Sequence, residues 1–218
     1  MNKHSDENYD AFYRRGGWQY DPSEEMLFLV YRVLQPLRVK PGIDVLELGC
    51  GMGLHSALFF QCGMRVTGID LSEVGIAEAS RRYPGPAFLH GDAHEYLAAA
   101  ESASFDLVFA SGMSWFHHNL RQQSGNSSIN LQDEMKAIFR VLRPEGYFIL
   151  RVRTDFSGTV HETGIVNHRW EDIVEFLDSS GELLMLTNWS GLPLTSPSIA
   201  RRFGGNVLAA VRKRRISE

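Results

Sequence analysis

The sequence predicts a doubly wound α/β fold with a mostly parallel sheet. Short apolar runs alternate with stretches of helical periodicity along most of the chain, as in repeated strand–helix–strand units. The run 105–110 (FDLVFA) is almost continuously apolar, as expected for a parallel strand that is covered on both faces. The run 43–48 ends in three glycines at alternate positions and is followed by a helical pattern from Leu54, which indicates a strand, a tight turn and a helix.

Length and composition are those of an ordinary globular protein. The 218 residues fit one domain, and 44% of them are hydrophobic and 22% charged. No apolar run approaches the ~20 residues that a bilayer helix needs, and the polar N-terminus does not resemble a secretion signal. Two cysteines are too few for a disulfide framework or a four-cysteine zinc site, so no metal is expected. We therefore expect a cytoplasmic protein, a monomer or homodimer, with no membrane segment.

The order of the elements supports this fold class. Strands are expected at 43–48, 64–69, 87–90, 105–110, 147–152, 183–186 and 206–211. Helices are expected from Pro22 to before Pro41 and at 54–61, 73–83, 95–100, 131–142 and 170–179. No clear helical pattern separates the last two strands, which suggests a closing β-hairpin at the sheet edge. Residues 1–40 are expected to form an N-terminal cap and helix, and residues 41–218 the main domain.

The glycine segment predicts a ligand site at the carboxyl end of its strand. Its spacing is Gly49-x-Gly51-x-Gly53, with an acid, Glu47, two residues before the first glycine. A dinucleotide fingerprint would place a third small residue where Leu54 stands. The unpaired N–H groups and partial positive charge of a helix start face such a turn. The alternative is an ordinary glycine turn in another α/β protein.

Two aspartates follow the next strands at the positions where an adenosine could bind. Asp70 stands 21 residues after Gly49, and a carboxylate there can accept hydrogen bonds from both ribose hydroxyls. Asp92 follows the third strand, where a side-chain oxygen could receive the adenine amine. Either aspartate could instead cap the helix that begins nearby.

Together these segments resemble the class I S-adenosylmethionine-dependent methyltransferases. The acid–glycine motif, Asp70 and Asp92 are joined by Phe105-Asp106-Leu107-Val108 with Ser111, and by Leu142-Arg143-Pro144-Glu145-Gly146, in which Glu145 replaces a glycine of the family turn. The resemblance covers the central half of the chain, from Val45 to Leu150. It implies a Rossmann-like, seven-stranded sheet with an antiparallel closing hairpin and an N-terminal helical cap.

The resemblance also implies S-adenosyl-L-methionine as cofactor, with S-adenosyl-L-homocysteine as product. The expected cofactor contacts are Tyr13, Trp18, Glu47, Gly49, Cys50, Gly51, Gly53, Asp70, Leu71, Asp92, Ala93 and Ser111. The cofactor carries the reactive methyl group, so the protein mainly has to orient the reactants in a dry pocket. A general base is useful without being obligatory. The candidates are His117 and His118 after the fourth strand and His161 after the fifth; each could instead only pack near the cofactor.

The acceptor class follows from motifs that the chain lacks. The Asn/Asp-Pro-Pro-aromatic motif of nucleic-acid amine methyltransferases, a cysteine placed for cytosine methylation and the catalytic set of ribose methyltransferases are all absent, which favours a small-molecule acceptor. Residues 201–218 carry six basic residues and one acid, however, so a nucleic-acid or protein methyltransferase is an alternative. A regulatory protein that binds the cofactor without catalysis is another. A nicotinamide-dependent oxidoreductase is opposed by Leu54 and Glu47.

The N-terminal segment 9–20 contains five aromatic residues and a Gly16-Gly17 break. Such aromatic surface needs an apolar partner, and the glycine pair could serve as a hinge. We expect a lid over the cofactor and acceptor. The alternative is a clasp that packs permanently on the side of the sheet.

Overall fold

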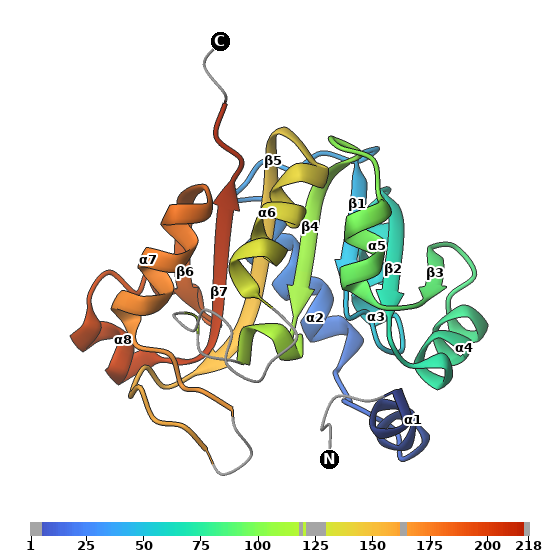
Figure 1. The fold of residues 1–218 in the computed structure, drawn as a ribbon, viewed down its shortest axis with the longest axis horizontal. Coiled ribbons are helices and arrows are strands. Elements are labelled where there is room, and N and C mark those ends of the chain that lie inside the picture. The colour runs from blue at the N-terminus through green and yellow to red at the C-terminus, as the bar shows by residue number, and fades with distance from the viewer. Residues whose placement is uncertain (1–5, 118–119, 121–129, 162–164, 216–218) are drawn as a thin grey trace. The chain divides into compact units, whose positions relative to one another are not determined.

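The computed structural model describes residues 6–117, 120, 130–161 and 165–215, which fall into two compact units, Met1–Ala99 and Ala100–Glu218. Among these residues there are three strands in the first unit and four in the second (Figure 1). Each strand lies within a few residues of its expected position, and 87–90 is reproduced without any shift. The division into a cap, 1–40, and a main domain, 41–218, stays a prediction.

The first unit is a three-stranded parallel sheet with helices. Its elements are α1 (Asp6–Arg14), α2 (Pro22–Phe28), the π-helix η1 (Leu29–Leu34), β1 (Asp44–Leu48), α3 (Leu54–Gln61), β2 (Arg65–Asp70), α4 (Glu73–Arg82), β3 (Ala87–His90) and α5 (Ala93–Ala99). Strand β2 lies between β1 and β3 and is parallel to both. All three strands therefore end at one edge, where Gly49, Leu71 and Gly91 follow them.

The helices of the first unit begin where the sequence supplies a cap. Asp21 accepts hydrogen bonds from the amides of Ser23 and Glu24, and Pro22 occupies the first turn of α2. The predicted single helix after Pro22 changes type: from Leu29 it continues as a π-helix, with the amide of Gln35 donating to the carbonyl of Val30. Apolar periodicity alone cannot distinguish the two helix types, because the π-turn adds a single residue.

The second unit mixes parallel and antiparallel strands. Its elements are β4 (Phe105–Ser111), the 3₁₀ helix η2 (Ser114–His117), α6 (Leu131–Val141), β5 (Leu142–Thr154), α7 (Trp170–Ser180), β6 (Glu182–Asn188), α8 (Pro197–Phe203) and β7 (Gly205–Arg212). Strands β4 and β5 are parallel, and β7 pairs antiparallel with both β5 and β6. The closing antiparallel pair is therefore present at the end of the chain, as expected.

Two local expectations in the second unit need correction. The connection between β6 and β7, where no clear helical pattern was found, contains α8, whose start is capped by Ser196 and has Pro197 in its first turn. The pair Ser196-Pro197 is itself a helix-start signal, because serine is a favoured N-cap and proline is favoured in the first turn. Strand β5 also begins at Leu142 rather than Tyr147, with Glu145 at φ 65°, so the expected turn is an irregular part of the strand.

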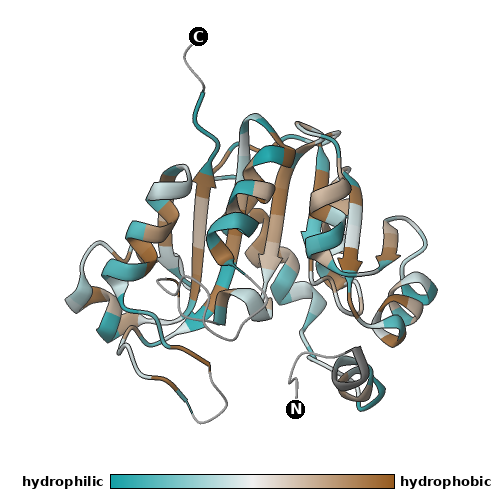
Figure 2. Cartoon of the chain, viewed as in Figure 1, coloured by the Kyte–Doolittle hydropathy of each residue, from teal (hydrophilic) through white to brown (hydrophobic). Residues whose placement is uncertain are grey.

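The strands of each unit consist mostly of hydrophobic residues, whereas the helices mix hydrophobic and hydrophilic residues (Figure 2). In the second unit, Phe109 and Phe148 are fully buried on paired strands. Burying one large apolar side chain is worth about 1.5–3 kcal/mol, so these strands form the core of the unit. Helices α6 and α7 pack against this core and against each other.

Candidate cofactor site

The glycine turn after β1 has the backbone that its sequence predicts. Gly49, Gly51 and Gly53 have φ values of 70°, 53° and 80°, in the left-handed region that favours glycine. A Cβ added at Gly53 would lie 2.7 Å from the ring of Phe88 and 2.8 Å from Cβ of Ala79. Gly53 therefore permits close packing of the start of α3.

Asp70 joins the glycine turn to the start of α4. One carboxylate oxygen accepts the amide of Gly51 at 2.8 Å and the other accepts the amide of Ser72 at 2.9 Å. Burial raises the pKa of this carboxyl, and the two amides oppose the shift. The N-cap of α4 is Ser72, whose hydroxyl accepts the amide of Gly75. Ser72 therefore caps α4 in place of Asp70, and the bond from Gly51 holds the carboxylate of Asp70 beside the glycine turn.

Asp92 has the second role that the sequence allowed, a helix cap. It is exposed, and its carboxylate accepts the amide of His94 at 2.7 Å in the first turn of α5. Asp92 therefore caps a helix, and its contact with an adenine amine stays a prediction. Ala93 beside it is buried, and Leu71, directly after β2, is half-buried.

Glu47, the acid of the glycine motif, points into the first unit. It is 1% exposed, its carboxylate accepts the hydroxyl of Ser56 at 2.5 Å, and it lies 3.4 Å from Nδ1 of His55. The opposite nitrogen of His55 lies 3.0 Å from the carboxylate of Glu25, on α2. The pairing of His55 with Glu25 leaves no signal in the sequence, because the two residues stand 30 positions apart and neither belongs to a family motif. Cys50, also on the turn, is buried, and burial raises the pKa of its thiol.

Tyr13 lies against the glycine turn. Ideal Cβ atoms at Gly17, Gly51 and Gly75 would come within 2.7, 2.6 and 3.2 Å of Tyr13, so its ring packs against three glycines. Burial, together with the charge of Asp70, raises the pKa of its hydroxyl. Trp18 is 66% exposed and packs edge-on against Phe12.

Helix α1, which carries Tyr13, is fastened to the start of α4 by Asp10. Its carboxylate accepts the hydroxyl of Ser72 at 2.5 Å and the amide of Val74 at 3.2 Å. The hydrogen bond from Ser72 lowers the pKa of Asp10. One serine therefore caps α4 and also holds the N-terminal helix.

In the second unit, a hydrogen bond joins the segment after β4 to the segment after β5, and these two segments carry the candidate bases. The carbonyl of His117, at the end of η2, accepts the amide of Val166 at 2.9 Å. His168, buried after the same loop, has its Nε2 2.6 Å from the carbonyl of Phe116. Ser111 ends β4 and is half-buried. His118 lies outside the described residues.

His161 is exposed, and one ring nitrogen is already occupied. Its Nε2 lies 3.0 Å from the amide nitrogen of Asn167. The orientation of that amide is fixed, because its oxygen accepts the backbone N–H of Asp155. Asn167 therefore donates to Nε2, and a neutral His161 carries its proton on Nδ1. In this geometry, His161 suits a hydrogen-bond donor better than a base.

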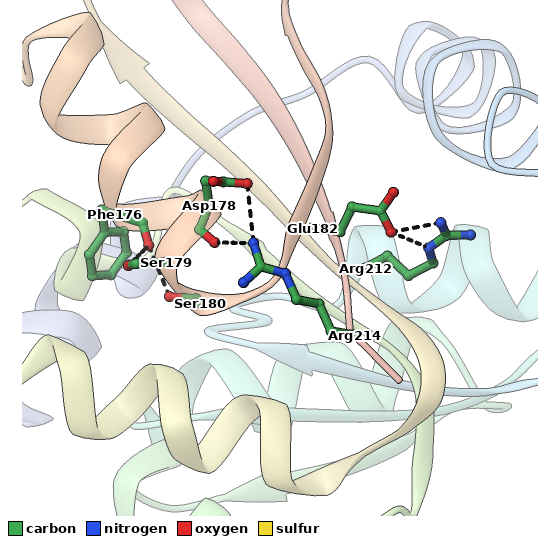
Figure 3. Close-up of polar contacts among 7 residues, drawn as sticks. All are labelled: Phe176, Asp178, Ser179, Ser180, Glu182, Arg212 and Arg214. Carbon is green, nitrogen blue, oxygen red and sulfur yellow. Dashed lines mark hydrogen bonds and ion pairs between the residues drawn. The ribbon is translucent and has the colours of Figure 1, made fainter. Parts of the chain in front are cut away.

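Three arginines of the C-terminal segment pair with acids of the second unit, and two of these pairs are drawn in Figure 3. Arg212 contacts Glu182 at 2.6 Å, and Arg214 contacts Asp178 at 3.4 Å. Arg215 lies 3.2 Å from Glu145. Within the described part of the chain, no helix is both long and apolar enough to cross a membrane.

Comparison with known proteins agrees with this geometry. The family model described as "Methyltransferase domain" matches residues 46–150. The chain belongs to the class I S-adenosylmethionine-dependent methyltransferase superfamily. The family, the α/β fold and the cofactor type expected from the sequence are thereby confirmed.

Among curated proteins, a probable S-adenosylmethionine-dependent methyltransferase of Mycolicibacterium smegmatis is 27% identical over 81% of this chain and 66% of its own length. An S-adenosyl-L-methionine-dependent Diels-Alderase of Talaromyces variabilis is 32% identical over 64% of this chain and 47% of its own length. A malonyl-[acyl-carrier protein] O-methyltransferase of Enterobacter lignolyticus is 36% identical over 47% and 36%. The chain thus spans about a third to two thirds of the length of these relatives.

Solved structures show the same fold at low sequence identity. A methyltransferase of Clostridium acetobutylicum has a TM-score of 0.67 at 15% identity and covers 95% of this chain and 96% of its own. A phosphoethanolamine N-methyltransferase of Haemonchus contortus, solved with S-adenosyl-L-methionine, has a TM-score of 0.66 at 18% identity over 99% of this chain and 59% of its own.

Proposed function

We propose that this protein transfers a methyl group from S-adenosylmethionine to a small-molecule acceptor. The observation that carries the proposal is the joint between the glycine turn and Asp70, covered by Tyr13. The residues fit the cofactor: the turn brings bare backbone to the edge of the sheet, and a buried carboxylate stands at the position suited to two ribose hydroxyls. S-adenosylmethionine supplies the electrophilic methyl group when bound.

The chain's own residues bind, orient and exclude water. Asp70 retains acceptor capacity beyond its two backbone bonds, since each carboxylate oxygen has two lone pairs. Gly49, Gly51 and Gly53 allow the ligand to approach the backbone. Tyr13 and the helix that carries it cover the turn, which limits access of water. We infer that the segment 9–20 is the lid of this site, with Asp10 as its fastening.

Two observations support a small acceptor. The cover over the turn suits a ligand that can be enclosed, and the ion pairs of Arg212, Arg214 and Arg215 partly neutralise the charge that a nucleic acid would need. Several related proteins have names that specify small acceptors, such as squalene methyltransferase and demethylmenaquinone methyltransferase. The acceptor atom can be oxygen, nitrogen or sulfur.

A second candidate function has one specific observation in its favour. The relative from Talaromyces variabilis is a Diels-Alderase that depends on S-adenosylmethionine. A chain of this superfamily can therefore bind the cofactor in the service of another reaction, and a cofactor-binding protein without methyl transfer is the alternative.

Methyl transfer is tested by incubating the protein with S-adenosylmethionine that carries a labelled methyl group and with a cell extract. The extract is separated into metabolite, nucleic-acid and protein fractions. The proposal predicts that label enters the metabolite fraction. Label in nucleic acid or protein alone would reassign the acceptor, and cofactor binding without labelling of any fraction would favour the alternative.

A further inference from the structure

A buried histidine beneath the glycine turn lies between two carboxylates. His55, in the first turn of α3, has Nε2 3.0 Å from Oε2 of Glu25 and Nδ1 3.4 Å from Oε1 of Glu47. The three residues are 6%, 4% and 1% exposed, so water does not screen the contacts. They belong to α3, α2 and β1, and Glu47 is the acid of the glycine motif.

With both acids ionised, only a doubly protonated ring satisfies this geometry. A neutral imidazole has one N–H group, so one ring nitrogen would face a carboxylate with lone pair against lone pair. Only the imidazolium can donate to both acids. Burial by itself lowers the pKa of His55, but the hydrogen bonds to Glu25 and Glu47 outweigh it and raise the pKa above 6.5.

Other titratable groups around the cluster come from several elements. The ring of Tyr20, before α2, lies 5.7 Å from that of His55. Asp70 on β2, Cys50 on the turn and Tyr13 on α1 each have a pKa that the charge of Glu47 helps to raise, after burial. Two carboxylates and one imidazolium leave the cluster with one excess negative charge.

We propose that His55, held as an imidazolium by Glu25, is a positioning residue for the cofactor, because it fixes Glu47 at the base of the glycine turn. His55 does not itself touch the cofactor. It joins α2 to β1 and α3, so the turn keeps its shape while both ionic hydrogen bonds are present. This inference rests on the proposed cofactor site.

The pH dependence follows from the sign of the shift. A histidine whose pKa is raised on folding contributes stability that is fully present below its unfolded value and is lost as pH rises through the folded value. Cofactor affinity should therefore fall on the alkaline side, when the ring loses a proton and one carboxylate contact becomes repulsive.

The variant Glu25→Gln separates the alkaline loss of affinity that His55 causes from other pH effects on cofactor binding. A glutamine can donate its amide to the unprotonated Nε2 of a neutral ring, so His55 can lose its charge without losing a contact. The variant should consequently lack the alkaline loss that His55 causes. Glu24→Gln is the matched control, because Glu24 is an exposed neighbour on the same helix.

The probe is S-adenosylhomocysteine, titrated calorimetrically from about pH 6 to about pH 10. Its α-amino group titrates in this range for every variant, so comparisons between variants isolate the contribution of His55. The affinity of the unaltered protein should fall about tenfold more than that of Glu25→Gln, the scale of one hydrogen bond to a charged group. Glu24→Gln should follow the unaltered protein.

Nuclear magnetic resonance of the ring nitrogens keeps the proposal testable if a variant folds poorly. Both nitrogens of His55 should be protonated at neutral pH in the unaltered protein. A neutral ring there, or superimposable affinity profiles for the unaltered protein and Glu25→Gln, would overturn the inference while leaving the cofactor site intact. If the unaltered protein bound no S-adenosylhomocysteine at any pH, the proposed site and this inference would both fail.

Discussion

Replacing Asp70 with asparagine should weaken cofactor binding far more than it weakens the fold. Asparagine presents one acceptor oxygen and one NH2 group that only donates, so one of the two backbone amides that now donate to Asp70, Gly51 or Ser72, would face a donor. The ribose would lose a charged acceptor. Hydrogen bonds to charged groups are worth about 1.5–3 kcal/mol, so affinity for S-adenosylhomocysteine should fall about 10- to 150-fold.

The free energy of unfolding of Asp70→Asn should change less than its cofactor affinity, because the pKa of Asp70 is raised in the folded protein. Burial raises the pKa of Asp70, so its stabilising effect is present below the unfolded value of 3.8 and is lost as pH rises through the folded value. At neutral pH the ionised carboxylate is therefore a cost to the fold. Asparagine removes that cost while it loses one backbone bond, and the free energy of unfolding should change by less than about 1 kcal/mol.

Calorimetric titration and thermal unfolding measure the two quantities separately. Asp44→Asn is a suitable control, because Asp44 begins β1 and pairs at the surface with Arg65, at the opposite end of the strand from the turn. The control should bind normally. Unchanged affinity in Asp70→Asn would refute the ribose assignment, and a parallel loss of stability and affinity would show that Asp70 acts only through the fold.

Three further outcomes follow from the contacts. Gly53→Ala should destabilise the protein by about 2–3 kcal/mol in denaturant unfolding, because φ is unfavourable and the new Cβ would meet Phe88; an unchanged midpoint would contradict this. Asp10→Ala should speed proteolysis at Arg14-Arg15, as should acid that protonates Asp10 below its lowered pKa, whereas protection that persists in the variant would show that other contacts hold α1. Deleting residues 212–218 should leave turnover of a small acceptor nearly unchanged, and loss of salt-dependent RNA binding would instead favour the nucleic-acid alternative.

Local signals in the sequence predicted most of the fold. Glycines at alternate positions after an apolar run predict a turn, and Gly49, Gly51 and Gly53 all have positive φ. Strand β3 was predicted at its exact limits, because proline and glycine bound it on both sides. The type of the helix after Pro22 was missed at Leu29, since a π-turn changes hydrogen bonds without changing the apolar pattern.

The site was predicted less completely, because its parts meet across long sequence separations. Tyr13 packs against Gly51 and Gly75, and no local pattern joins these positions. Glu25 and His55 likewise pair through the fold. Trp18, close to Tyr13 in the sequence, is largely exposed, and its contact with the cofactor stays a prediction.

The most direct test of the central claim is calorimetric titration of the unaltered protein with S-adenosylhomocysteine in the presence and absence of NAD. The account predicts one ligand per chain, with a dissociation constant on the order of micromolar, about −8 kcal/mol, and no competition from NAD. The absence of binding, or displacement by NAD, would contradict the assignment of the glycine turn and Asp70 to S-adenosylmethionine.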